Sequence, residues 1–315
     1  MKENLLISVN ALVPLFVLIA LGFVLTKVGL TNENFNKIAN RLCFKVALPV
    51  SIFNSIYSVS FAEALRGKLI LWATILFLMA LVISIVLVLL FSKDPKKRGV
   101  LLQCAVRSNY VYIGIPICEN LFGEEGLVVA STMIPFVVVI FNVSAVLILT
   151  IFSGGAKKVD VKAMAKNLVT NPLILAAAIA VVYNLTGLPL PQVASKTLSD
   201  IAKLATPMAL ISLGGSFEFK AVGRQLRYII FGTSMRMVLV PLIVLTTAHF
   251  AGFGGAELAV LFVMFGSPVA ISSYPMAVEM NGDGELAGQL VVFTTLASMF
   301  TMFAGVFLMK TLGWM

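Results

Sequence analysis

The fold is decided by two stretches of sequence, Arg107-Ser-Asn-Tyr-Val-Tyr-Ile-Gly-Ile-Pro116 and Gly266-Ser-Pro-Val-Ala-Ile-Ser-Ser-Tyr-Pro275. Both lie inside long apolar runs, and both place serine, glycine and proline where a helix would otherwise continue. Proline removes a backbone donor and clashes with the preceding turn. Each run is therefore predicted to be a helix that is interrupted near its middle. In a bilayer such an interruption is tolerated only where the freed backbone groups face protein or a wet cavity.

The surrounding sequence is typical of a polytopic membrane protein. Of its 315 residues, 60% are hydrophobic and 12% are charged, whereas a soluble domain carries about 25% charged residues. Apolar runs of 18 or more residues recur, which indicates membrane-spanning helices. We predict an all-α membrane protein with ten spanning helices, at about residues 5–26, 35–58, 69–91, 99–122, 126–152, 168–186, 195–217, 228–250, 256–280 and 285–309.

The formal net charge of +9 does not indicate nucleic-acid binding, because the basic residues lie in short gaps between apolar runs. Fourteen lysines and arginines lie toward one side of the predicted membrane, in the gaps or near the helix ends, and five lie toward the other. The positive-inside rule places the fourteen in the cytoplasm. We therefore expect a multi-pass protein of the cell membrane with both termini outside and the loop at 153–167 in the cytoplasm.

An internal repeat divides the chain into halves. At an offset of 158 or 159 residues, helix breakers and rare charges coincide: Pro14 with Pro172, Lys45 with Lys203, Pro49 with Pro207, Arg66 with Arg224, and Pro116 with Pro275. We predict a first five-helix repeat at 1–152, a cytoplasmic linker at 153–167 and a second repeat at 168–315. Because five is odd, the second repeat enters the membrane from the opposite side. Inverted repeats of this kind are found in many secondary transporters.

In such folds the substrate lies near the bilayer midplane, where paired helices are interrupted. The helical segment after each break would point its positive N-terminus at the centre, which suits an anion. The alternative is that the two prolines only kink packed helices. The candidate binding residues at the breaks are Arg107, Asn109, Tyr110, Gly114, Pro116, Ser267, Pro268, Ser272, Ser273 and Pro275.

Charged residues inside the predicted helices provide a second set of candidates. Lys45 and Lys203 lie about eleven residues into their helices, and Arg236 lies within another. A charge at the bilayer centre costs at least about 2.5 kcal/mol, so it should have a partner or a function. Two interpretations of the lysines stay open: they bind the substrate, or they neutralise the C-terminal ends of the broken half-helices. Both favour an anionic substrate.

Three residues are expected to support the lysines. Pro49 and Pro207 each follow a lysine by four residues, and Asp200 precedes Lys203 by three, which allows an ion pair on one helix face. No catalytic motif such as HExxH or GxSxG occurs, and the three cysteines have no metal-binding spacing. We expect neither a metal nor a cofactor, and we do not expect an enzyme.

Several short segments together resemble the auxin efflux carrier family, which includes bacterial malate, malonate and oxalate permease-type proteins and the plant PIN auxin transporters. They are the opening segment Asn10-Ala-Leu-Val-Pro-Leu-Phe-Val-Leu-Ile-Ala-Leu-Gly-Phe, Leu48-Pro-Val-Ser-Ile-Phe, Asn109 with Gly114-Ile-Pro116, and the region of Pro268 and Pro275. The resemblance covers the whole chain and depends on the order and spacing of these segments.

The resemblance implies a scaffold domain beside a crossover domain, in which the fourth and ninth helices cross at their prolines in mid-membrane. Asn109 and Pro116 match the asparagine and proline of the first crossover, and Pro275 matches the second. The implied function is secondary active transport of a small organic anion, malate-like, malonate-like or auxin-like, by an elevator-type movement. A homodimer is also implied, and H+ is a candidate coupling ion. The alternatives are a sodium-coupled symporter for bile-acid-like anions and a cation–proton antiporter.

Overall fold

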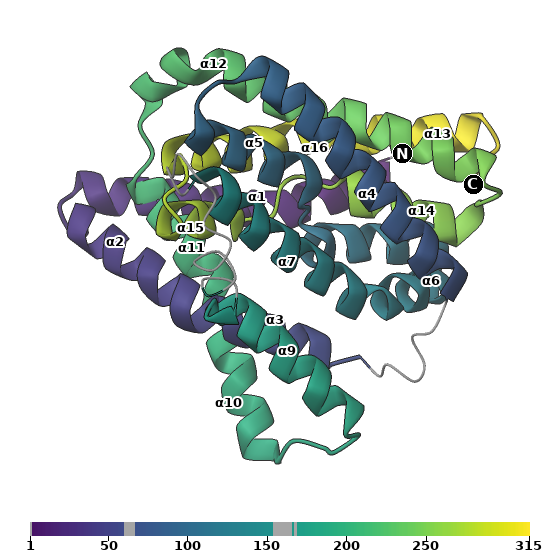
Figure 1. The fold of residues 1–315 in the computed structure, drawn as a ribbon, viewed down its shortest axis with the longest axis horizontal. Helices are drawn as coiled ribbons and strands as arrows, with labels where there is room; N and C mark the ends of the chain where they lie inside the picture. The colour runs from purple at the N-terminus through teal and green to yellow at the C-terminus, as the bar shows by residue number, and fades with distance from the viewer. Residues whose placement is uncertain (1, 60–66, 154–165, 167–168) are drawn as a thin grey trace.

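The computed structural model describes residues 2–59, 67–153, 166 and 169–315, with side chains from residue 13 onward. All regular structure in these residues is helical. Four of the described helical runs are long and apolar enough to cross a membrane, judged by length and composition: Gly67–Phe91, Ile134–Phe152, Phe219–Phe250 and Gly284–Thr311. The prediction of an all-helical membrane protein is confirmed at this level (Figure 1).

The first half of the chain contains α1 (Lys2–Lys27), α2 (Glu33–Leu42), α3 (Leu48–Tyr57), α4 (Gly67–Phe91), α5 (Pro95–Val106), α6 (Ile115–Thr132) and α7 (Ile134–Ser153). The second contains α9 (Pro172–Leu185), α10 (Gln192–Lys203), α11 (Ala205–Gly215), α12 (Phe219–Ser234), α13 (Val240–Phe250), α14 (Gly255–Gly266), α15 (Ser273–Glu279) and α16 (Gly284–Thr311). Side chains that accept hydrogen bonds from free backbone N–H groups begin four of these helices: Asn32, Asp94, Asn171 and Asp283.

Three helical turns are wider than an α-helix, and each precedes a proline. These π turns are η1 (Cys43–Ala47), η2 (Tyr110–Gly114) and η3 (Met235–Leu239), and the prolines are Pro49, Pro116 and Pro241. In each case the residue before the proline donates its N–H to the carbonyl five residues earlier. A proline ring clashes with the carbonyl four residues before it, so a wider turn lets the helix continue.

The stretches at 107–116 and 266–275 are interrupted, and their interruptions contact each other. The backbone is extended at Arg107, after α5, and at Ser267, after α14. Ser108 and Val269 form an isolated antiparallel bridge. The N–H of Asn109 also donates to the carbonyl of Pro268 at 2.8 Å. The backbone groups that the breaks release are therefore partly satisfied by each other.

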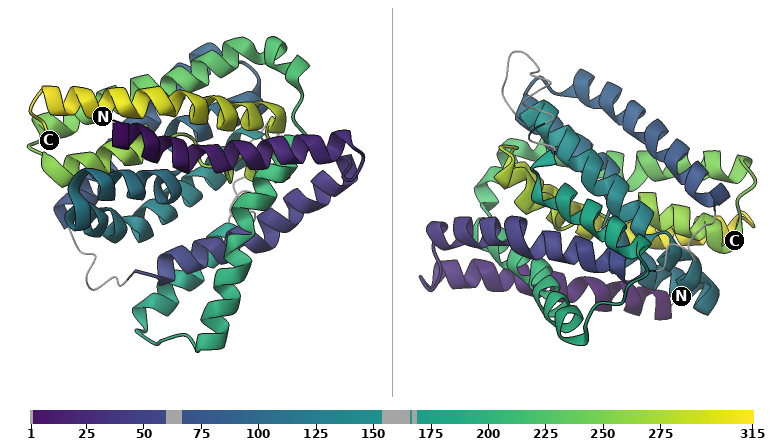
Figure 2. Two further views of the ribbon diagram at one scale, coloured as in Figure 1. Left: turned by 180° about the vertical axis from the view of Figure 1, so that it is seen from behind. Right: turned by 60° about the horizontal axis from the view of Figure 1, so that its bottom comes forward.

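Close helix packing places α1 against α11. A Cβ added to Gly214 would lie 1.9 Å from the carbonyl oxygen of Ile19, and one added to Gly22 would lie 2.1 Å from that of Ile211. Small residues allow two helix backbones to approach this closely. In Figure 1, α3, α9 and α10 extend from one side of a larger group of helices that contains α4 to α7 and α12 to α16. The two chain ends lie near each other in all views (Figure 2).

Some predicted helix boundaries are corrected by the structure. The helix predicted at 126–152 is divided at Met133, and its first part belongs to α6, which turns at Gly123 with φ 59°. The helix predicted at 195–217 is divided at Leu204 into α10 and α11. Apart from Ser153 and residue 166, the predicted linker at 153–167 lies outside the described residues.

Replacing Gly214 by alanine should destabilise the protein by about 1–3 kcal/mol, because the new methyl group collides with backbone that cannot move aside easily. Thermal melting of the purified protein in detergent measures the loss. Gly223→Ala is the matched control, because a Cβ there meets nothing within 4 Å. Wild-type melting of Gly214→Ala would contradict the close α1–α11 contact.

Candidate functional site

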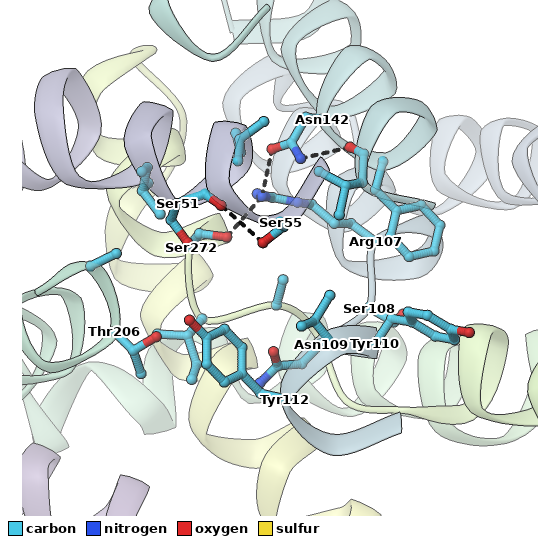
Figure 3. A pocket seen from close by; sticks show the side chains of 18 of the residues that line it. Ser51, Ser55, Arg107, Ser108, Asn109, Tyr110, Tyr112, Asn142, Thr206 and Ser272 are labelled. Carbon is cyan, nitrogen blue, oxygen red and sulfur yellow. Dashed lines mark hydrogen bonds between the residues drawn. The ribbon is translucent and has the colours of Figure 1, made fainter. Parts of the chain in front are cut away.

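A cavity of about 100 Å³ lies beside the two paired breaks. It is enclosed by α3, the break after α5, α7, α11 and the break before α15. Among the described residues that line it, one is charged and none is acidic. The polar lining residues are shown in Figure 3: Ser51, Ser55, Arg107, Ser108, Asn109, Tyr110, Tyr112, Asn142, Thr206 and Ser272.

Arg107 is the charged residue, and its side chain is 4% exposed. Its guanidinium donates to Asn142 Oδ1 at 2.9 Å and to Ser272 Oγ at 2.7 Å, and it also contacts the side chains of Ser273 and Met276. All four partners are uncharged. No carboxylate of the described residues forms an ion pair with Arg107. The positive charge in the cavity is therefore solvated by neutral dipoles and has no counter-ion among the residues that the structure describes.

The break in the helix explains why Arg107 can reach these partners. Because α5 ends at Val106, the extended backbone of Arg107 carries the side chain toward α7 and the start of α15 (Figure 3). Asn142 Nδ2 donates to the carbonyl of Val138, which turns the amide oxygen toward the guanidinium. Asn142 was not predicted from the sequence. The signal that could have found it is a single amide side chain in the apolar run Ile134–Ser153.

Asn109 presents an unused amide to the cavity. The side chain is 5% exposed and forms no hydrogen bond with the described part of the chain, whereas its backbone N–H is held by Pro268. Hydroxyl groups complete the lining: Ser51 and Ser55 on α3, Thr206 on α11, and Tyr112 after the first break. Buried polar groups are normally hydrogen-bonded, so the free amide indicates a position for a polar ligand.

Four of the residues predicted at the breaks line the cavity: Arg107, Asn109, Tyr110 and Ser272. The hydroxyl of Tyr110 donates to the carbonyl of Ala130 at 2.8 Å, so its ring supports α6. The α15 helix has seven residues, so its macrodipole adds little. The other predicted break residues shape the chain near the cavity without lining it: Gly114, Pro116, Ser267, Pro268, Ser273 and Pro275.

The structure does not place Lys45 or Lys203 in the cavity, and neither lysine donates to the end of a broken half-helix. Both side chains are exposed. Lys203 forms the expected ion pair with Asp200 at 3.1 Å, on the outside of the molecule. The buried sides of their helices are occupied by neighbours such as Cys43 and Ala205, which leaves the lysines facing outward. Pro49 lies in α3 and Pro207 in α11, and both are half-buried.

Arg236 does not line the cavity either, although it is fully buried. Its Nε donates to Ser267 O at 2.8 Å, and its two terminal nitrogens donate to Ala105 O at 2.9 Å and Met264 O at 3.2 Å. These carbonyls lie at the ends of α5 and α14. Arg236 therefore donates to the ends of two broken helices, which is one of the two roles that the sequence suggested for the lysines.

The chemistry of the cavity suits a small anion. A guanidinium, a free amide and several hydroxyls supply donors, and apolar side chains of α3, α7 and α11 supply the remaining walls. Pockets for small molecules commonly combine apolar walls with a few polar groups in this way. No group of three or more histidine, cysteine, aspartate or glutamate side chains that could hold a metal occurs in the described ranges.

Comparison with known proteins gives matches along nearly the whole chain. The model of a family described as membrane transport protein matches residues 7–304. An uncharacterized transporter of Methanothermobacter thermautotrophicus is 25% identical over 295 residues, which cover 93% of this chain and 95% of the relative. An uncharacterized transporter of Methanocaldococcus jannaschii is 25% identical, with 93% and 96% covered. The uncharacterized transporter YfdV of Escherichia coli K12 is 24% identical, with 92% and 95% covered.

Cysteine placed at Ser55 should react with a small water-soluble thiol reagent, because Ser55 lines the cavity. The native cysteines Cys43, Cys104 and Cys118 are buried and should react slowly. Ser84→Cys is the control, since that side chain is fully buried in α4. Mass spectrometry of the labelled protein measures the reaction. Equal labelling of the two variants would contradict an accessible cavity at α3.

Proposed function

The chain belongs to the membrane transport protein family, that of the auxin efflux carriers, and from this premise we propose that it is a secondary active transporter of small organic anions. The family resemblance drawn from the sequence is confirmed, and the protein is a membrane transporter. The proposed cargo is a malate-like or malonate-like carboxylate, or an auxin-like one.

The buried, unneutralised guanidinium of Arg107 is the observation that carries the proposal. Placing such a charge inside a membrane protein costs about 2.5–3.5 kcal/mol unless a partner compensates it. A substrate carboxylate would provide the missing charge and could accept two parallel hydrogen bonds from the guanidinium. The neutral contacts to Asn142 and Ser272 keep the group in place while the cavity is empty of substrate.

The other lining residues support a small carboxylate over the alternatives. The amide of Asn109 and the hydroxyls of Ser51, Ser55 and Thr206 can hold the polar end of the molecule. A cavity of about 100 Å³ favours a short acid over a steroid of bile-acid size. A cation–proton antiporter would use acidic side chains, and the described lining contains none. A cationic substrate would also be repelled by Arg107.

For the architecture we propose ten spans in two inverted repeats, with the breaks crossing in mid-membrane. The cavity lies between two groups of helices that could act as separate bodies. Ser51, Ser55 and Thr206 belong to the group of α3 and α11, the proposed scaffold. Arg107 and Ser272 belong to the group that holds both breaks, the proposed crossover domain. Sliding the second group past the first would carry the bound anion across the membrane, as in an elevator.

Several properties expected from the sequence remain part of the proposal. The protein is a multi-pass protein of the plasma membrane, with both termini outside and the loop at 153–167 in the cytoplasm. It forms a homodimer, and protons or the membrane potential supply the energy. The proximity of the chain ends supports termini on one side (Figure 2). The basic residues of the predicted cytoplasmic gaps support the orientation.

Purified protein in proteoliposomes should take up at least one carboxylate from a panel of radiolabelled malate, malonate, oxalate and indole acetate. The uptake rate should saturate as the substrate concentration rises, because the substrate must occupy the cavity and the number of carriers is fixed. The assay is run with and without a pH gradient, which identifies proton coupling. Absence of saturable uptake for the whole panel would contradict the proposal.

Replacing Arg107 by glutamine should lower kcat/KM for the transported acid by about thirtyfold or more, because a buried charge partner is lost. Arg107→Lys should be intermediate, since an ammonium keeps the charge but not the planar pair of donors. Lys45→Gln is the matched control and should stay within about twofold of wild type, as expected for an exposed charge. An effect of Lys45→Gln as large as that of Arg107→Gln would restore the interpretation drawn from the sequence.

Changing Asn109 tests the sign of the substrate charge. Asn109→Ala should lower kcat/KM by about three- to tenfold, the effect of one neutral hydrogen bond. Asn109→Asp should be more harmful, because the new carboxylate would place a negative charge in the cavity and repel an anion. Uptake kinetics of the two variants in proteoliposomes give the comparison. Higher activity of Asn109→Asp than of Asn109→Ala would indicate a cationic or neutral substrate.

A further inference from the structure

Arg236 is a fully buried cation whose partners are backbone carbonyls. It lies in the π turn η3, between α12 and α13, and its side chain is 0% exposed. Every hydrogen bond from its guanidinium ends on a main-chain oxygen, of Ala105, Met264 or Ser267. No described aspartate or glutamate forms an ion pair with it. Because Arg236 does not line the cavity, contact with a substrate there does not explain why this charge is buried.

The three carbonyls have a common position in the fold. Ala105 lies in the last turn of α5, whereas Met264 and Ser267 lie at the end of α14. The last carbonyls of a helix have no partner within the helix and carry the negative end of its dipole. Here two such ends converge inside the protein, next to the paired breaks. Their oxygens form a site that attracts positive charge.

Convergent carbonyls from broken helices are a common binding site for a coupling cation in transporters. In this chain the site is occupied by a side chain. We propose that the Arg236 guanidinium is a resident cation, held where a transporter of this architecture could bind a metal cation, so that the carrier works without Na+ or K+. The expected effects on uptake rest on the proposed function, whereas the expected effects on thermal stability rest on the geometry alone.

The same contacts make Arg236 a positioning residue for the substrate site. Ala105 precedes Arg107 by two residues, and Ser267 precedes the Pro268 carbonyl that holds the Asn109 N–H at 2.8 Å. By fixing both helix ends, Arg236 also fixes the backbone near Arg107 and Asn109, which line the cavity. The contacts also tie α12–η3–α13 to α5 and α14. We infer that these helices move as one body, because separating them would expose three carbonyls without donors.

One cation serves both helix ends, because Arg236 donates to α5 and to α14, and the predicted internal repeat supplies no charged counterpart for it. With an offset of 158 residues, Leu78 in α4 takes the position that corresponds to Arg236. Leu78 is apolar and 52% exposed, so the first half supplies no equivalent charge. The two repeats therefore differ at this point, and the asymmetry is compensated by Arg236 donating to α5 of one half and α14 of the other.

The experiment compares three substitutions of Arg236 in the full-length protein. Lysine keeps a positive charge, methionine fills similar space without charge, and alanine leaves room for an added cation. Arg227→Gln is the matched control, because it removes an exposed arginine from α12 and changes the net charge equally. Thermal melting in detergent is measured for each variant in Na+, K+ or choline chloride, with and without millimolar guanidinium. Uptake of radiolabelled malonate is measured in the same media.

Wild-type melting and uptake should be the same in Na+, K+ and choline. Arg236→Met should lose more than about tenfold in uptake and should melt below Arg236→Lys, because the carbonyls lose charged donors. Guanidinium should raise the melting temperature of Arg236→Ala and restore part of its uptake. It should not raise that of the wild type or of Arg227→Gln, since guanidinium ordinarily weakens folded proteins.

Two results would overturn the proposal. The first is a higher melting temperature or faster uptake of the wild type in Na+ or K+ than in choline. This result does not depend on the folding of any variant. The second is equal behaviour of Arg236→Lys and Arg236→Met, which would make the side chain a space filler. If malonate is not transported by the wild type, the substrate assignment fails on its own. The melting measurements then still decide whether Arg236 acts as a resident cation.

Discussion

The structure depends on one constraint, the need to satisfy the backbone groups released where two helices are broken inside the protein. A buried N–H or C=O without a partner costs free energy, so each released group needs a hydrogen-bond partner. The bridge between Ser108 and Val269 and the bond from Asn109 N–H to Pro268 O satisfy part of the two breaks. The guanidinium of Arg236 satisfies the helix-end carbonyls.

Two buried arginines near the breaks have opposite roles, and their partners explain the difference. Arg236 is surrounded by carbonyl oxygens at the negative ends of two helices, so its charge is compensated and its position is fixed. Arg107 contacts an amide oxygen, hydroxyls and a sulfur, which orient it without neutralising it. The first arginine therefore belongs to the framework, and the second is available to a ligand.

The prolines act through the turns that precede them. Pro49, Pro116 and Pro241 each follow a π turn, in which one additional residue is accommodated before the helix continues. An inserted residue rotates the following side chains relative to the preceding ones. Lys45 lies within η1 and Arg236 within η3, so the direction of both side chains is set by these wide turns. Sequence periodicity of an ordinary α-helix cannot describe that direction.

The sequence by itself determined the helical membrane class and the interruptions before Pro116 and Pro275, and it singled out Arg107 and Asn109, which line the cavity. These features are local, because hydropathy, helix breakers and rare polar residues act within a few turns of one segment. Only the tertiary structure decided which charges face the cavity. Lys45 and Lys203 point outward, Arg236 turns to the carbonyls of two distant helices, and Asn142 from α7 joins Arg107. The physical reason is that the partner of a buried charge lies on a helix far away in the chain. The packing of such helices cannot be predicted from the sequence of any one segment.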